Sequence, residues 1–420
     1  MMQPSSDSSV SYHYLADDLN LTSGPEEYRW ALRCVTLLAG CNTDDVRCTL
    51  GEFTLGQCNG KYEALSYTWG DPNDTTQIYL DEEPFSVTAN LKSALHCLRL
   101  LDKYRLLWTD SICINQDNVS EVNIQVQRMW AIYKYSSRVV VFLGREAKGT
   151  TSVAGLLTRL TVDVSPKDYR AITSILQDKS EAASWKALDE LMKRPWWSRA
   201  WIVQEFAVHR EVVFICGTVE IPESIFGSAL EILVGYRFNA IVPKPLQYFV
   251  RHIASTPISH LWTVRRAYQK YGLDERMRHP ANMLYRFRDF ESFDPGDKVY
   301  SLFRLMGEDA DLKPNYNRSV QELYKDVLKT FDHEIFHDNA VVFRRLEAIE
   351  TEILRRLKAN SGAEKKPWSS LDSLRATLVG SRIRKKGPSQ KATVLSPSDA
   401  GNLWHVWYEH MRNQTSNELR

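Results

Sequence analysis

One acidic residue lies in a segment of the chain that is otherwise suited to burial. The stretch RPWWSRAWIVQEF, residues 194–206, holds three tryptophans and two arginines around Glu205. If residues 198–209 are helical, one stripe contains Trp197, Trp201, Glu205 and Val208. A carboxyl group against aromatic rings is partly desolvated, which raises its pKa unless a cation such as Arg199 or Arg194 compensates. Two interpretations stay open, a functional carboxylate and a structural ion pair with arginine.

A polar loop supplies the second candidate site. The stretch WTDSICINQDNVSE, residues 108–121, is predicted to leave a buried strand at Asp110 and to enter a helix after an amide-rich loop. Because ligands of open α/β sheets bind outside the carboxyl ends of the strands, Asp110, Asn115 and Gln116 are candidate ligand-binding residues. The alternative is that Asp110 and Asn115 organise the loop and cap the following helix.

One motif is typical of a zinc protease, but its surroundings argue against a metal site. HEIFH, residues 333–337, matches the pattern H-E-x-x-H. The apolar stripe of the predicted helix comprises Val320, Leu323, Val327, Phe331 and Ile335. His333 and His337 then point away from this stripe toward water, and the seven cysteines of the chain include no C-x-x-C pair. We therefore expect no metal.

The elements that would position these residues alternate between strands and helices. Buried strands are predicted at 62–70, 104–110, 137–144 and 211–217. The segments between them carry helical periodicity, which predicts an α/β fold with a parallel sheet flanked by helices, followed by a mainly helical region. The expected organisation is a polar N-terminal segment at 1–27, a short β lead-in at 28–60, an α/β domain at 61–218 with an insertion at about 145–180, a helical region at 219–335 and a mostly mobile tail at 336–420.

Composition narrows the class of protein further. The 420 residues include 53 basic and 52 acidic ones, a net charge of +1, so no overall field favours nucleic acid or an anionic membrane. The N-terminus lacks the apolar region of a signal peptide, and the apolar run VVVFLG at 139–144 is too short to span a bilayer. RIRKKG at 382–387 is interpreted as a solvated charge run. A soluble, cytoplasmic protein without a membrane span is expected.

Three long stretches resemble, in order and spacing, the heterokaryon incompatibility (HET) domain of fungi. They are YEALSYTWGD, the segment from LLWTDSICINQD to VVVFLG, and RPWWSRAWIVQEF followed by ICG. The chain departs from the family pattern at Glu121-Val122, where the family usually has Glu-Arg. The resemblance implies an effector of fungal self/non-self recognition and programmed cell death.

HET domains are in turn similar to TIR domains, which implies a TIR-like, flavodoxin-like fold. SRAWIVQEF looks like the TIR segment in which a Ser, a Trp and, four residues after the Trp, a Glu open a helix; here these are Ser198, Trp201 and Glu205. In TIR domains that hydrolyse NAD this glutamate is catalytic. Residues 145–196 must loop out for the correspondence to hold.

The TIR resemblance yields two hypotheses of function. In the first, NAD is a substrate rather than a cofactor and Glu205 is the catalytic carboxylate. The expected ligand-binding residues are then Trp69, Asp110, Asn115, Gln116, Arg199 and Trp201. In the second, the domain is a non-enzymatic assembly module that signals by self-association or partner binding. In both hypotheses a sensor would be a separate protein.

Overall fold

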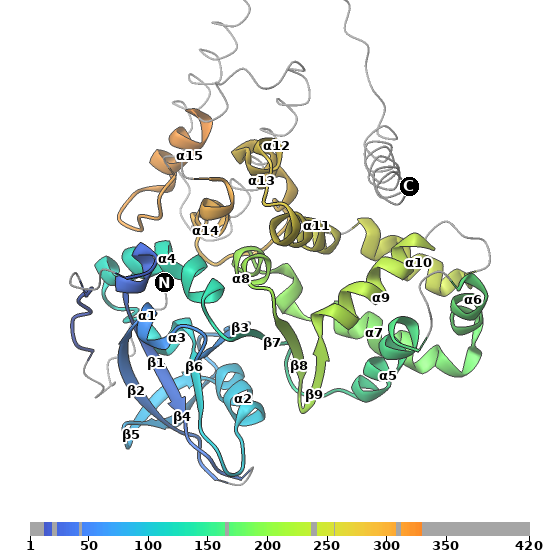
Figure 1. Ribbon diagram of the computed structural model, residues 1–420, viewed down its shortest axis with the longest axis horizontal. Helices are drawn as coiled ribbons and strands as arrows, with labels where there is room; N and C mark the ends of the chain where they lie inside the picture. The colour runs from blue at the N-terminus through green and yellow to red at the C-terminus, as the bar shows by residue number, and fades with distance from the viewer. Residues whose placement is uncertain are drawn as a thin grey trace, which may run out of the picture. The chain divides into compact units, whose positions relative to one another are not determined.

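The computed structural model describes most of the chain up to residue 329 (Figure 1). The described ranges are 12–18, 23–41, 44–163, 168–236, 242–255, 257–307 and 312–329. They all belong to the first of two units into which the chain divides, Met1–Asn360. The HEIFH motif at 333–337, the RIRKKG run at 382–387 and the tail predicted at 336–420 lie outside the described residues.

A central mixed sheet forms the core of the described chain. Its strands are β1 (Ala31–Leu37), β2 (Arg47–Thr54), β3 (Glu63–Tyr67), β4 (Thr75–Leu80), β5 (Glu83–Thr88), β6 (Arg105–Trp108), β7 (Arg138–Phe142), β8 (Val212–Cys216) and β9 (Val219–Pro222). Their spatial order is β5-β4-β2-β1-β6-β3-β7-β8-β9. The block β6-β3-β7-β8 is parallel throughout. The carboxyl ends of these four strands therefore meet at one edge of the sheet.

The sequence of the parallel strands explains their position. In β7 only Arg138 is less than buried, and every residue of β8 is buried. Such continuous runs of valine, isoleucine and phenylalanine suit strands that helices cover on both faces. The predicted α/β architecture, with helices around a central sheet and a mainly helical part after it, is confirmed at this level.

The N-terminal strands join the same sheet as the parallel block. β1 runs antiparallel to both β2 and β6, with Val35 opposite Leu107. β2 in turn pairs with β4, and β4 forms a hairpin with β5. The hairpin turns at Asp81 and Glu82, whose φ angles of 52° and 68° are those of a two-residue turn with the right-handed twist of the strands. The β lead-in predicted at 28–60 thus extends the central sheet.

Helices cover the sheet and form the later part of the described chain. Those up to β8 are α1 (Leu55–Cys58), α2 (Ala89–Leu98), α3 (Asp110–Cys113), α4 (Val119–Lys134), α5 (Thr150–Thr161), α6 (Tyr169–Gln177), α7 (Ala182–Met192) and α8 (Ile202–Val208). Those after β9 are α9 (Glu223–Gly235), α10 (Lys244–Ser255), α11 (Pro257–Lys270), α12 (Glu275–Arg278), α13 (Pro280–Arg286), α14 (Asp297–Tyr300) and α15 (Val320–Lys329). Short 3-10 helices are η1 (Glu26–Arg29), η2 (Lys179–Glu181), η3 (Pro195–Ser198) and η4 (Phe303–Leu305).

The segment between β7 and α8 leaves the sheet intact. It contains α5, α6 and α7, yet β7 and β8 are adjacent and parallel, with Val139 opposite Val212. The inserted helices therefore loop out of the strand order, as the TIR correspondence requires.

The helical region packs directly on the helix that carries Glu205. Figure 1 shows α11 beside α8, and the two helices are in contact. The ring of Trp262 in α11 lies 5.1 Å from the ring of Phe206 in α8 and 5.5 Å from that of Trp197. This aromatic packing joins the region after residue 219 to the α/β part.

Candidate active site

Glu205 lies inside the protein, next to the carboxyl end of β3. It is 1% exposed, and its Oε2 accepts a hydrogen bond from the hydroxyl of Ser66. The Ser66 oxygen in turn accepts a hydrogen bond of 2.8 Å from the indole Nε1 of Trp196. Burial raises the pKa of Glu205 to about 7, although the charge of Arg199 and the Ser66 hydrogen bond oppose this rise. Near neutral pH this carboxyl group can exist in both protonation states.

The helix that carries Glu205 is shorter than the sequence predicted. α8 begins at Ile202, whereas Trp197 belongs to the separate 3-10 helix η3, which starts at Pro195. Between them the backbone at Arg199 is extended and forms an isolated bridge with Glu291, a residue far along the chain. The single stripe predicted for Trp197 and Glu205 is therefore wrong, because this long-range bridge interrupts the helix.

Arg199 does not pair directly with Glu205. Its guanidinium donates to the backbone carbonyl of Tyr67 at the end of β3. No ion pair within 4.0 Å joins Arg199 to Glu205, both of which the structure describes. Its charge nevertheless lowers the pKa values of Glu205 and of Asp110. Arg199 thus acts on two carboxyl groups through space, and the bidentate arginine pair considered for Glu205 is absent.

Asp110 follows β6 and provides the second carboxyl group of the cluster. Its Oδ2 accepts a 2.9 Å hydrogen bond from the indole of Trp69, and its Oδ1 accepts one of 2.8 Å from the backbone of Ser111. Burial raises the pKa of Asp110, and its negative charge raises that of Glu205. Trp69, Asp110, Arg199 and Glu205 therefore gather at the carboxyl edge of the parallel strands.

Asn115 and Gln116 hold the loop after β6. Gln116 donates through Nε2 to the backbone carbonyl of Asp110 at 2.9 Å, and the side chain of Asn115 accepts from the backbone of Asp117 at 3.2 Å. The backbone N–H of Asn115 donates to Glu121 Oε1 at 2.9 Å. These contacts organise the loop, as the structural alternative proposed for Asn115, but the residue that caps α4 is Asn118, whose side chain accepts from the backbone N–H of Glu121.

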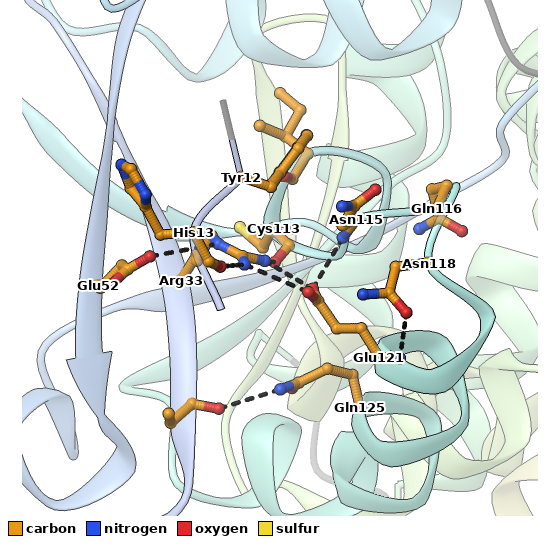
Figure 2. Close-up of polar contacts among 12 residues, drawn as sticks. Tyr12, His13, Arg33, Glu52, Cys113, Asn115, Gln116, Asn118, Glu121 and Gln125 are labelled. Carbon is orange, nitrogen blue, oxygen red and sulfur yellow. Dashed lines mark hydrogen bonds and ion pairs between the residues drawn. The ribbon is translucent and has the colours of Figure 1, made fainter. Parts of the chain in front are cut away.

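A buried ion pair anchors the same loop from the other side. Figure 2 shows Arg33 of β1 reaching Glu121 at the start of α4, with Nη1 2.6 Å from Oε1. Arg33 is 1% exposed and also donates to the backbone carbonyls of Cys113 and His13. Glu121 immediately precedes Val122, where the chain departs from the family pattern. It is a structural anchor of the loop, and the cation that pairs with it is Arg33 of β1.

Trp201 faces a different carboxyl group. It immediately precedes α8, and its side chain lies close enough to Asp297 to lower the pKa of that residue. Burial nevertheless raises the pKa of Asp297 to about 6, and Tyr316 donates its hydroxyl to Oδ1 at 2.6 Å. The tryptophan in hydrogen-bond contact with the Glu205 network is Trp196.

Three residues of the cluster were not singled out from the sequence. Ser66 and Trp196 form the hydrogen-bonded chain to Glu205, and Tyr133 of α4 lies close enough to lower its pKa. Ser66 is the one residue of β3 with an aliphatic hydroxyl group, and its side chain is buried, with 1% exposed. A small polar residue within a buried strand is the signal that could have identified it.

The described part of the chain lacks two further features. There, no group of three or more His, Cys, Asp or Glu side chains is arranged to hold a metal ion. Among the helices of the same residues, none is long and apolar enough to cross a membrane.

The fold and the cluster define a mixed α/β domain with a buried carboxyl group at the carboxyl edge of its parallel strands. Residues 62–205 match the family model described as Heterokaryon incompatibility protein (HET). The chain therefore contains a HET domain, and the resemblance seen in its motifs is confirmed.

A curated relative supports the same assignment. Over 338 residues the chain is 26% identical to "Heterokaryon incompatibility protein 6, OR allele" of Neurospora crassa. The match covers 67% of this chain and 48% of the relative, so the chain spans about half the length of that protein. No solved structure matches the chain.

Proposed function

We propose that this protein acts in fungal heterokaryon incompatibility and that its HET domain hydrolyses NAD with Glu205 as the catalytic carboxylate. The role in incompatibility is suggested by the family of residues 62–205 and by the name of the Neurospora crassa relative. The single observation that carries the chemistry is the state of Glu205, a buried carboxyl group with a pKa of about 7 and no paired cation within 4.0 Å among the described residues.

The proposed reaction suits such a group. Cleavage of the bond between ribose and nicotinamide develops positive charge on the ribose, which an adjacent carboxylate stabilises or traps covalently. Nicotinamide takes the electrons of the broken bond and leaves as a neutral molecule, so no general acid is needed. Water then adds to the ribose carbon, displacing the carboxylate where it has bonded covalently, and releases a proton. The lack of a direct arginine partner favours the neutral form of this carboxyl group, but once it is ionised no neighbouring cation competes with the ribose for its charge.

The strand order supports a TIR-like, flavodoxin-like domain. Numbered along the chain, β3, β6, β7 and β8 lie in the order 2-1-3-4, which is the beginning of the flavodoxin-like order 2-1-3-4-5. In that order ligands bind where the connections reverse direction, beside the first strand. Ser66 and Tyr67 end β3 at this position, and we propose that Trp69, Asp110 and Arg199 bind NAD there while Asn115 and Gln116 shape the site. Trp201, which lies against Asp297, has no part in this proposal.

The test is release of nicotinamide from NAD by concentrated purified protein. We expect turnover by the wild-type protein, less than 1% of it in Glu205→Gln, and an unchanged rate in Glu190→Gln, an exposed control on α7. The rate should rise as the pH passes through about 7, because the ionised form of Glu205 is the active one. Full turnover by Glu205→Gln would contradict the catalytic role.

One observation favours the second candidate, a non-enzymatic assembly module. Glu205 is only 1% exposed, so NAD reaches its carboxylate only after the residues around it move. Self-association that opens the site would reconcile the two hypotheses. The assay is therefore run on preparations that light scattering shows to be assembled. The assembly module would be favoured if such preparations release no nicotinamide and Glu205→Gln assembles as the wild-type protein does.

A further inference from the structure

A cavity of about 420 Å³, open to solvent and lined by no residue of the Glu205 cluster, lies between α4 and the segment before α15. α4 contributes Asn123 and Gln127, and residues 313–318 form the other wall. The volume is within the range of small-molecule sites. Amides and two cations dominate the lining, and none of the lining side chains carries a carboxylate.

The hydrogen bonds of two lining amides orient these two as donors, whereas Gln127 already donates its Nε2 to the backbone carbonyl of Pro314. Asn123 Oδ1 accepts from the backbone N–H of Tyr316 at 2.8 Å, and Asn315 Oδ1 accepts from that of Asn317 at 3.0 Å. A backbone N–H can donate only to the oxygen of a side-chain amide. These bonds therefore identify which atom of each amide group is the oxygen and which is the nitrogen. Within the described chain, the Nδ2 groups of Asn123 and Asn315 have no partner, and they remain to bind a ligand.

Two cations add positive charge to this donor-rich wall. Lys313 is exposed and forms no ion pair with any described residue. Arg318 pairs with Asp326 through Nη2, which leaves its Nη1 and Nε groups for other acceptors. N–H donors and cations that line one cavity, with no carboxylate among the lining side chains, match a ligand with several anionic oxygens.

We propose that this cavity binds a small molecule that carries phosphate groups. Lys313 and Arg318 neutralise the phosphate charge, and the Nδ2 groups of Asn123 and Asn315 donate to its oxygens. The site is separate from the proposed chemistry at Glu205 and stands without it.

The test is calorimetric titration of the full chain with pyrophosphate. We expect saturable binding at one site, weakened at least tenfold in Lys313→Glu and unchanged in Lys148→Glu, an exposed lysine outside the cavity. Asn123→Asp is the sharper variant. One aspartate oxygen still accepts the hydrogen bond from the backbone N–H of Tyr316, while the Nδ2 donor is replaced by a negatively charged carboxylate oxygen. It should lose at least tenfold in affinity with an unchanged melting temperature.

Two results with pyrophosphate would overturn the proposal. One is the absence of heat from pyrophosphate at millimolar concentration with the wild-type protein. The other is wild-type affinity in both Lys313→Glu and Asn123→Asp, which would put the binding elsewhere. Citrate serves as the comparison ligand, and binding of citrate at equal or greater affinity would contradict the preference for phosphate.

Discussion

Glu205 is a carboxyl group whose surroundings favour its neutral form more than water does. The Ser66 hydroxyl and the field of Arg199 stabilise the ionised form, but the loss of water outweighs both. Removal of a carboxylate from water costs several kcal/mol unless it is paired, and direct pairing is what Arg199 does not provide. A group in this balance responds to pH in the neutral range.

The stability of the protein should depend on this titration. Burial raises the pKa of Glu205 from 4.5 to about 7, so between these values the folded protein holds a proton that the unfolded chain has lost. The free energy of unfolding therefore falls as the pH rises through this window. Glu205→Gln removes the titration and should gain about 3 kcal/mol relative to wild type between pH 4.5 and pH 8, measured by urea-induced unfolding.

Other carboxyl groups titrate in both proteins, so the difference between the two curves isolates Glu205. Glu190→Gln on the exposed face of α7 is the matched control for the loss of a carboxyl group at the surface. A pH-independent difference for Glu205→Gln would mean that the carboxyl group is not protonated in the folded protein.

The residues of the site were only partly accessible from the sequence. Glu205 could be identified because one carboxylate among tryptophans is unusual, and Asp110 because it follows a predicted buried strand. Ser66 and Trp196 could not, since their hydrogen bond joins β3 to a segment 130 positions further along the chain. Local periodicity carries no information about such a contact.

At the scale of single elements, α8 depends on a side chain from outside the matched HET region. Arg265 of α11 donates to the backbone carbonyls of Phe206 and His209 at 2.5 Å and of Arg210 at 2.8 Å. It is 4% exposed, and its other partner is Glu223. A cation at these carbonyls donates hydrogen bonds to acceptors that lack a partner at the end of the helix. It also interacts favourably with the negative end of the helix dipole. Arg265 therefore fixes the short helix that positions Glu205.

Replacement of this arginine should loosen α8. Arg265→Met leaves the carbonyls and Glu223 without their cation and should destabilise the protein by about 3 to 5 kcal/mol in urea unfolding. Its neighbour Arg266 is the control, since its side chain is 50% exposed and pairs with the equally exposed Glu231. Arg266→Met should cost less than about 1 kcal/mol.

Hydrogen exchange separates a local effect on α8 from a general loss of stability. In Arg265→Met, the amides of Ile202–Val208 should exchange faster than those of β7 and β8 by more than the change in global stability explains. Equal costs for Arg265→Met and Arg266→Met would show that Arg265 does not hold the helix.

For the whole molecule, local sequence patterns predicted the individual strands and helices better than the way in which these pair and pack. The parallel strands follow from their apolar runs and alternate with amphipathic helices, and the structure contains them. The pairing of β1 with β6 joins residues about 70 positions apart, such as Val35 and Leu107, and no periodicity specifies it. The contact of α11 with α8 is equally non-local, and through it the helical region predicted at 219–335 packs on the α/β part.

The folding of the α/β part should therefore require the helices that follow it. Trp262 of α11 packs on the rings of Trp197, Phe206 and Phe214, at 5.1 to 6.3 Å, and Arg265 caps α8. A chain that ends at Pro222 exposes this aromatic face to water and loses the cap. We expect it to bind the dye ANS, to lack near-ultraviolet circular dichroism and to unfold without a cooperative transition. A chain that ends at Lys329 is the control and should unfold cooperatively, because it retains α9 to α15. Cooperative unfolding of the shorter chain would instead establish residues 1–222 as an independent folding unit and the contact with α11 as dispensable.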